Sequence, residues 1–263
     1  MKLSPVIVIV ISFAVSILSV GCTAEKEIAE TYPVTSIQLT EEKQVHAPTP
    51  SPSPAVSPTL QPLAADTPVY FPSPTVTPIP ESFFITDISG TGQYFALGCE
   101  ASAAVDWANY FGVLIYEYNF QHELPISDNP DLGFVGDAKG PWGQVPPYAY
   151  GVHAGPVANR LREYGLPAVG AKGLTLDQIK ASLADSKPVI AWVIGNMVGG
   201  IPYEYTDKEG TVTSVAAYEH VVILTGYSQE NIRYINNGKF YEVPVDVFLN
   251  SWGVLGNMAV LHE

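Results

Sequence analysis

The sequence predicts an α+β domain in which helices come first along the chain and antiparallel strands follow. An alanine-rich segment with helical spacing of its apolar residues begins at Cys99, and Thr175 opens a second helix pattern with a capping box. Later, alternating apolar strands flank an Asn-Asn-Gly turn at 236–238. Because such helices pack as a layer on the sheet, we expect the chemistry in a cleft between the two layers.

The first 22 residues have the layout of an export signal. Lys2 precedes an apolar run that extends to Val20, and Gly21 then precedes Cys22. A small residue followed by cysteine resembles a bacterial lipoprotein processing site, so we expect Cys22 to carry lipid and to anchor the protein at the extracytoplasmic face of the membrane. An uncleaved membrane anchor and simple secretion are the alternatives.

Residues 23–81 are predicted to form a disordered stalk. Residues 48–80 hold 11 of the 23 prolines of the chain, interleaved with Ser, Thr, Ala and Val. Proline at this density favours an extended conformation of about 3 Å per residue. The segment would therefore hold the rest of the chain well away from its anchor.

The remainder, residues 82–263, has the size of one domain of about 180 residues. The formal net charge of the chain is −14, with only 12 Lys and Arg residues, which argues against nucleic acid as a partner and against electrostatic docking to anionic lipid. We therefore expect a monomer that meets the membrane only through its N-terminus.

The order of predicted elements starts with the helix at 99–110, which ends before Gly112. A long, proline-rich loop at 121–151 follows, and its length indicates a functional or mobile segment. The remaining predicted elements are helices at 155–165 and 175–186, strands at 188–194, 220–227, 232–236 and 239–243, a helix at 244–252 that starts with a proline, and a last strand at 258–261.

Cys99 is the only cysteine of the predicted domain, and it opens a helix. At that position the helix dipole and free backbone N–H groups lower a thiol pKa, so Cys99 is a candidate nucleophile. Gly98 would let a substrate approach closely. The backbone N–H of Cys99 and the side-chain amide of Gln93 could together form an oxyanion hole, each donor stabilising the intermediate by about 3 kcal/mol. A buried structural cysteine is the alternative.

A thiolate needs an imidazole partner that later protonates the leaving amine. His220 begins an apolar strand, which would hold its ring rigidly at the cleft, although a structural histidine is the alternative. Asn236 and Asn237 follow in the tight turn, where either amide could accept the second N–H of the ring. The other histidines are scattered over terminal or loop segments, so the sequence predicts no metal site and no cofactor.

Aromatic residues of the long loop are candidates for a substrate groove, namely Trp142, Tyr148 and Tyr150. They could equally pin the loop to the core. Glu100 could influence the thiolate, but acidic residues are common in first helical turns because of the helix dipole.

Several motifs together resemble one family. Gln93, the "GCEASAA" run around Cys99, "SDNPDLGFVGD", "WGQVPPYAYGVHAGPV", "EHVVILTGY" and "FLNSWGVLGNMAV" are similar to stand-alone relatives of the bacteriocin-processing, double-glycine-type cysteine peptidases, family thirty-nine of the papain-like clan. The resemblance covers nearly all of residues 90–263. It implies a papain-like fold with Cys99 as nucleophile, His220 as base, Gln93 in the oxyanion hole and Asn237 as the residue that orients the imidazole. The family usually has aspartate followed by proline where this chain has Asn237-Gly238.

The sequence hypothesis is thus an exported, lipid-anchored cysteine peptidase that acts on peptide or protein substrates. A peptidoglycan-directed amidase would use the same residues, as would a transglutaminase-like acyl transferase. A surface binding module that keeps the cleft without useful turnover is the alternative from another class.

Overall fold

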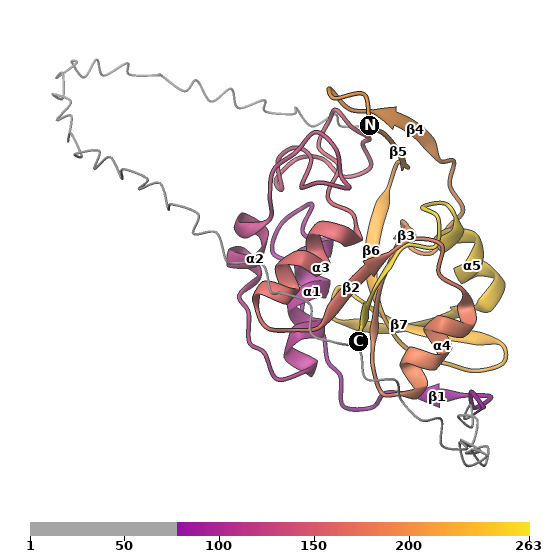
Figure 1. The fold of residues 1–263 in the computed structure, drawn as a ribbon. Coiled ribbons are helices and arrows are strands. Elements are labelled where there is room, and N and C mark those ends of the chain that lie inside the picture. The colour runs from indigo at the N-terminus through magenta and orange to yellow at the C-terminus, as the bar shows by residue number, and fades with distance from the viewer. Residues whose placement is uncertain (1–77) are drawn as a thin grey trace, which may run out of the picture. The chain divides into compact units, whose positions relative to one another are not determined.

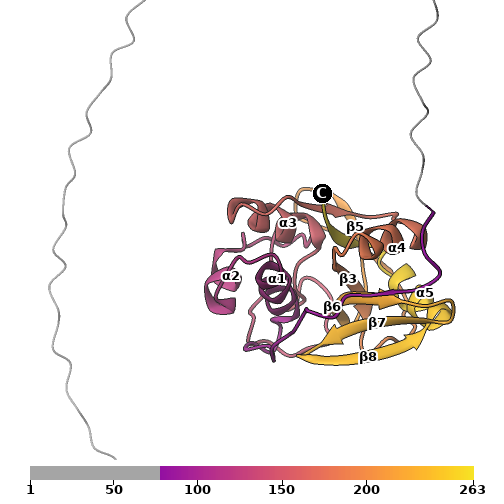
Figure 2. The same cartoon turned by 90° about the horizontal axis from the view of Figure 1, so that it is seen from below.

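The computed structural model describes residues 78–263, so the predicted signal, Cys22 and most of the predicted stalk lie outside the described residues. Three helices gather on one side of the domain: α1 (Cys99–Tyr110), α2 (Glu117–Glu123) and α3 (Ala154–Glu163). The strands, with α4 (Leu176–Ala184) and α5 (Val245–Gly253), make up the other side (Figures 1 and 2). Within the described residues no helix is both long and apolar enough to cross a membrane.

One antiparallel sheet of seven strands forms the framework of the domain. Its central strands are β3 (Val189–Ile194) and β6 (Glu219–Tyr227), which pair along the whole length of β3. The predicted α+β fold with a C-terminal antiparallel sheet is therefore confirmed. The strand order is β2 (Ala168–Ala171), β9 (Ala259–His262), β3, β6, β7 (Asn231–Asn236) and β8 (Lys239–Pro244), and β1 (Phe83–Phe84) pairs with the end of β6.

Helix α1 has the predicted bounds, and its alanines explain why it lies so close to the sheet. Residues 99–108 of this helix are all buried. Small side chains allow the helix backbone to approach β6, and the indole of Trp107 donates a hydrogen bond of 2.7 Å to the carbonyl of Pro188 just before β3. The helix that begins at Cys99 is thereby held against the sheet.

The predicted capping box and hairpin are also present. Thr175 and Gln178 exchange hydrogen bonds at the start of α4. Asn237 and Gly238 form the two-residue turn between β7 and β8, with φ of 49° and 75°, as a type I′ hairpin requires. This turn fixes which residue ends β7.

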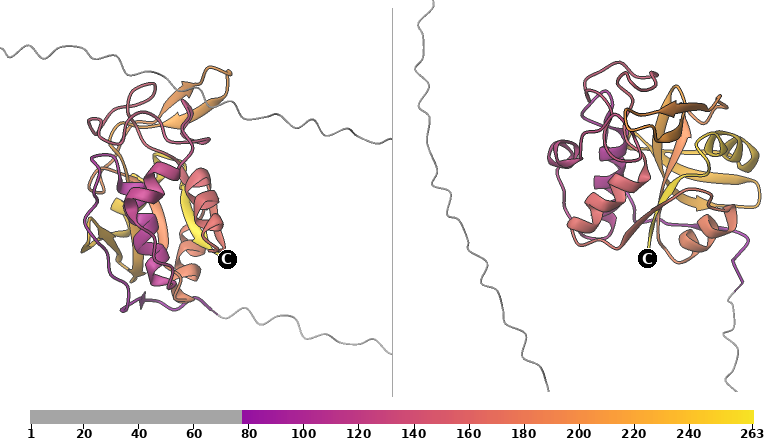
Figure 3. Two further views of the ribbon diagram at one scale, coloured as in Figure 1. Left: turned by 90° about the vertical axis from the view of Figure 1, so that its left-hand side faces the viewer. Right: turned by 45° about the horizontal axis from the view of Figure 1, so that its top comes forward.

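Five short elements were not predicted, namely β1, α2, β2, β4 (Tyr203–Thr206) and β5 (Val212–Val215). Helix α2 has seven residues, of which only Phe120 and Gln121 are buried, so no apolar period marks it. Strand β2 has four residues, and the separate hairpin of β4 and β5 is largely exposed. Figure 3 shows this hairpin projecting beside the long loop that precedes α3.

Candidate active site

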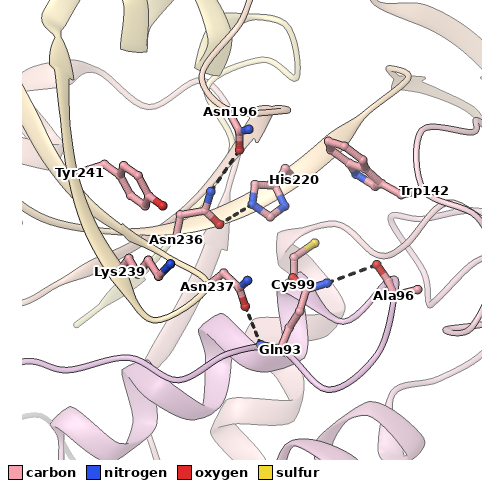
Figure 4. Close-up of a pocket in the computed structure, with 10 residues that line it drawn as sticks. All are labelled: Gln93, Ala96, Cys99, Trp142, Asn196, His220, Asn236, Asn237, Lys239 and Tyr241. Carbon is pink, nitrogen blue, oxygen red and sulfur yellow. Dashed lines mark hydrogen bonds between the residues drawn. The ribbon is translucent and has the colours of Figure 1, made fainter.

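A cavity of about 400 Å³ lies where the start of α1 faces the sheet. Cys99 reaches it from α1, His220 from β6 and Asn236 from the end of β7, and Figure 4 shows the sulfur pointing to the side of the cavity where the imidazole lies. The cavity is lined by Gln93, Ala96, Cys99, Trp142, Asn196, His220, Asn236, Asn237, Lys239 and Tyr241. The structure thus brings the two principal predicted residues to one site.

The thiol of Cys99 is buried, with 7% of the residue exposed. Its S–H donates to Oε2 of Glu100, 3.2 Å away. Burial raises the pKa of Cys99 well above its usual value, and the charges of Glu100 and then Glu219 raise it further. The expectation of a thiol pKa lowered by the helix dipole is therefore wrong for this arrangement, because desolvation and two nearby carboxyl groups outweigh the dipole.

The imidazole of His220 has a defined orientation. Its Nε2 lies 2.8 Å from Oδ1 of Asn236, whose amide nitrogen in turn donates to Oδ1 of Asn196 at 3.3 Å. Because a carboxamide oxygen only accepts, Nε2 carries the hydrogen and Nδ1 is left with a lone pair. Burial lowers the pKa of His220, and the hydrogen bond to Asn236 partly offsets this effect. The ring is therefore a neutral base at neutral pH.

Asn237 was predicted to orient the imidazole, and the structure corrects this prediction by one residue. Its Oδ1 instead accepts the backbone N–H of Gln93 at 2.9 Å. Ile223 pairs with Ile235 across β6 and β7, so residue 236 lies opposite residue 222 and shares its face of the sheet. Residue 220 lies two positions from 222 along β6 and therefore points to that same face. Asn236 therefore lies on the face of His220, whereas Asn237 lies in the turn.

Gln93 lines the cavity beside Cys99, as an oxyanion-hole residue would. Its Nε2, however, donates to the carbonyls of Phe95 at 2.9 Å and Ala96 at 3.2 Å. An amide nitrogen has two hydrogens, and both have acceptors here. The predicted role of Gln93 therefore requires that one of these bonds be exchanged for the oxyanion.

Of the predicted substrate-contacting residues, only Trp142 lines the cavity. Its indole donates to the carbonyl of Glu219 at 2.9 Å and meets the ring of His220 edge-on, with centroids 6.1 Å apart. Tyr150 is 3% exposed and packs with Val135 in a small separate core, which contradicts a place in a substrate groove. Tyr148 is exposed but does not line the cavity.

Gly98 has a different function from the one predicted. A Cβ at this position would lie 2.9 Å from Oε1 of Glu117 and 3.0 Å from Cβ of Phe95. The glycine is therefore needed for α1 to start against α2, and it is not among the residues lining the cavity. The prediction that Gly98 admits substrate is not supported by its position.

Two acidic side chains next to Cys99 lie in an environment that could not be predicted from the sequence. Glu100 is fully buried, and its Oε1 accepts the backbone N–H of Val152 at 2.7 Å. Glu219, at the start of β6, is 3% exposed, and its Oε1 has no hydrogen-bond partner. Burial raises the pKa of Glu100 to about 7 and that of Glu219 well above its usual value. Nothing in the sequence distinguishes Glu100 from an ordinary exposed acid of a first helical turn.

Cys99, Glu100 and Glu219 are also the one set of three metal-type donors that converge within the described residues, with ligand atoms within 4.8 Å of one another. The cavity of Figure 4 is lined by the cysteine but by neither carboxyl group. The raised pKa values mean that the two carboxyl groups take up protons readily.

A helix-borne thiol that faces an imidazole on an antiparallel sheet, with an amide orienting that imidazole, defines the papain-like class of cysteine peptidases. The chain belongs to the Peptidase C39 like family, whose sequence model matches residues 85–260. The resemblance inferred from the motifs is thereby confirmed.

One solved structure shows the same fold, and a second was matched at lower similarity. A C39-like peptidase from Bacillus anthracis is 22% identical, with a TM-score of 0.62, and the match covers 70% of this chain and 98% of that one. Xylellain, a cysteine protease from Xylella fastidiosa, is 14% identical with a TM-score of 0.39, over 71% of this chain and 87% of that one. No match was found among curated proteins.

Proposed function

We propose that this chain is an exported cysteine peptidase that hydrolyses peptide or amide bonds through a thioester on Cys99. The observation that carries the proposal is the orientation of His220. Its Nε2 is bonded to Asn236, which leaves the lone pair of Nδ1 available in the cavity that Cys99 also lines. This is the tautomer that a general base for a thiol requires.

In the proposed reaction, Nδ1 of His220 takes the proton of the Cys99 thiol, and the thiolate attacks the substrate carbonyl. The developing oxyanion accepts the backbone N–H of Cys99, which is free because it opens α1, and a side-chain N–H of Gln93. The imidazolium then protonates the leaving amine. Water, deprotonated by the same imidazole, hydrolyses the thioester and restores the thiol.

The substrate is proposed to be an extracellular or wall-associated peptide. Support comes from the sequence, in which an export signal, Cys22 and a proline-rich stalk precede the family domain. A lipid on Cys22 would hold the enzyme at the outer face of the membrane. Release of cell-wall fragments rather than cleaved proteins would identify the peptidoglycan-directed form of the same activity.

Two observations favour a binding module as the second candidate. In this structure the Cys99 thiol donates to Glu100, and no hydrogen bond joins it to His220 within the described residues. The side-chain N–H groups of Gln93 are also occupied. Turnover therefore requires that the S–H hydrogen turn from Glu100 to His220, whereas a binding module requires no such step.

Profiling of a peptide library with the full chain tests the proposal. We expect the wild type and Cys22→Ser to cleave the same peptides, because Cys22 lies outside the family domain. Cys99→Ala should lose cleavage by at least about a thousandfold, since it removes the nucleophile. Peptides that bind with equal affinity to wild type and Cys99→Ala but are cleaved by neither would support the binding module instead.

A further inference from the structure

The two buried carboxyl groups beside Cys99 come from different parts of the fold. Glu100 follows Cys99 on α1, and Glu219 precedes His220 on β6. Each therefore adjoins one of the two residues to which the proposed function assigns the chemistry. Their carboxylate oxygens and the sulfur of Cys99 lie within 4.8 Å of one another.

The surrounding backbone accommodates this pair at a specific position. A Cβ on Gly151 would lie 2.2 Å from Oε1 of Glu100 and 3.1 Å from Oε2 of Glu219, and the φ of Gly151 is 132°. The next residue, Val152, donates its backbone N–H to Glu100. A glycine at this point therefore gives Glu100 the space and the hydrogen bond that it needs.

The pair carries no compensating positive charge. No lysine or arginine of the described residues forms an ion pair with Glu100 or Glu219. Two buried carboxylates this close cannot both be ionised at moderate cost, so one of them keeps a proton. Oε1 of Glu219 accepts no hydrogen bond from the described residues, whereas Glu100 accepts two, so the proton resides mainly on Glu219.

We propose that Glu100 is a second hydrogen-bond acceptor for the Cys99 thiol, beside His220, and that protons held by the Glu100–Glu219 pair determine whether the sulfur can ionise toward His220. The proposal rests on the proposed function for the role of His220. It goes beyond that function because it gives a role to Glu100, which accepts the S–H of Cys99 and is not one of the three residues Cys99, His220 and Asn236.

The protons balance in both states of the site. With Glu100 ionised, its carboxylate accepts the S–H of Cys99, and a thiolate there would face a like charge that the backbone N–H of Val221 only partly offsets. With Glu100 protonated, the thiol gives its proton to His220, and the carboxylic acid of Glu100 donates a hydrogen bond to the resulting thiolate. No proton is lost in this second arrangement, because it moves from sulfur to imidazole.

Few other titratable groups face the pair. On the loop side Tyr150 lies nearby, and burial raises its pKa well above the usual value, so it remains neutral. Behind it, His153 contacts Tyr150 and is bonded to Asp131, and burial lowers the pKa of His153. From α1 the facing group is Cys99 itself, and the next residue after Glu219 on β6 is His220. Among these groups, Glu100, with a pKa of about 7, changes charge near neutral pH, whereas burial lowers the pKa of His220 and favours its neutral ring.

The test is the rate of Cys99 alkylation by a small neutral iodoacetamide, measured on the full chain from about pH 5 to 10 and mapped by mass spectrometry to separate Cys99 from Cys22. In the wild type the rate of alkylation should fall as the pH rises through about 7, because Glu100 ionises there and then holds the S–H of Cys99. In Glu100→Gln that change should be absent and the rate near pH 8 should rise about tenfold or more, which corresponds to one unit of thiol pKa.

Glu219→Gln is the second variant, and it should act in the opposite direction. Its amide can donate to Glu100, which favours the Glu100 carboxylate, so the change in rate should move to lower pH. Glu204→Gln, on exposed β4, is the matched control and should follow the wild type. If Glu100→Gln and Glu219→Gln both keep the wild-type profile, the proposal is overturned.

One measurement needs no variant that could misfold. The infrared spectrum of the wild type at neutral pH should contain the band of a protonated carboxyl group, and its absence would also overturn the proposal. Because alkylation needs no substrate, the proposal can fail while peptide cleavage persists, and cleavage can fail while the alkylation profile holds. The two accounts are therefore tested separately.

Discussion

The imidazole of His220 and the side-chain amide of Asn236 are joined by a hydrogen bond of 2.8 Å between neighbouring strands. Asn196 accepts from the other end of the same amide, so the oxygen of Asn236 is held toward the ring. The chain therefore fixes the tautomer of His220 with two amides and without a carboxylate. Four predictions follow from the contacts around this site.

Replacing Asn236 should slow chemistry more than binding. Asn236→Ala removes the acceptor that holds Nε2–H, so the ring can rotate and take the other tautomer, and kcat should fall about ten- to a hundredfold with little change in KM. Asn237→Ala should affect kcat less, because its contact is to the backbone of Gln93. Steady-state kinetics of the two variants provide the measurement. A larger loss of kcat in Asn237→Ala than in Asn236→Ala would show that Asn237 orients the imidazole.

The acid limb of the pH–rate profile should report His220. Burial lowers the pKa of His220, so its neutral form persists below the usual value of about 6.5 and the acid limb of kcat/KM should lie below that pH. Asn236→Asp places a carboxylate beside the ring, which favours the imidazolium and should move this limb to higher pH. An acid limb that is unchanged in Asn236→Asp would mean that the limb belongs to another group.

Gly151 should tolerate no side chain. Gly151→Ala puts a methyl group 2.2 Å from Oε1 of Glu100 at a φ of 132°, so we expect a loss of about 2–4 kcal/mol in the free energy of unfolding, together with altered reactivity of Cys99. Gly155→Ala is the matched control. Its new Cβ would have one neighbour, the backbone oxygen of Asp131 at 3.7 Å, and residue 155 lies in α3, where alanine favours the helix over glycine. Chemical denaturation of both variants should therefore give effects of opposite sign.

Asp131 should stabilise the long loop that includes Trp142 at neutral pH. Burial alone would raise its pKa, but hydrogen bonds and charge from His153, with Lys172 and Thr213, hold the pKa well below its usual value. The carboxylate is thus favoured in the folded state, so its contribution is present above about pH 4 and is lost as the pH falls below that value. Asp131→Asn should lower the free energy of unfolding by roughly 1–3 kcal/mol at pH 7, because the buried ring of His153 loses its charged partner.

The pH dependence provides the check on this contribution. Thermal unfolding followed between about pH 3 and 7 should show a smaller loss of stability toward acid in Asp131→Asn than in the wild type. Parallel curves for the two proteins would show that the Asp131 network does not contribute to acid sensitivity.

Local patterns in the sequence were sufficient for most of the framework. The bounds of α1 were predicted at both ends, because alanine spacing and Gly112 mark them, and the capping residues Thr175 and Gln178 marked α4. Helix α2 and the β4–β5 hairpin escaped prediction because neither buries enough apolar residues to show a period. Their positions are set by tertiary contacts.

The site was harder to predict than the fold, because it depends on register and burial. A shift of one residue separates Asn236 from Asn237, and only the pairing of β6 with β7 shows which one shares the face of His220. Likewise, the sequence places Glu100 beside Cys99 but does not reveal that a third segment, at Gly151, buries it. The raised thiol pKa follows from that burial.

The central claim is that Cys99 becomes a nucleophile through His220, and the most direct measurement is trapping of the acyl-enzyme. A peptide that the enzyme cleaves is made with an ester in place of the scissile amide. Its reaction should leave an acyl adduct whose mass maps to Cys99. The adduct should form in wild type and Cys22→Ser and should be at least about a hundredfold slower to form in His220→Ala. An adduct that forms at the wild-type rate without His220, or that maps to any residue other than Cys99, would contradict the account.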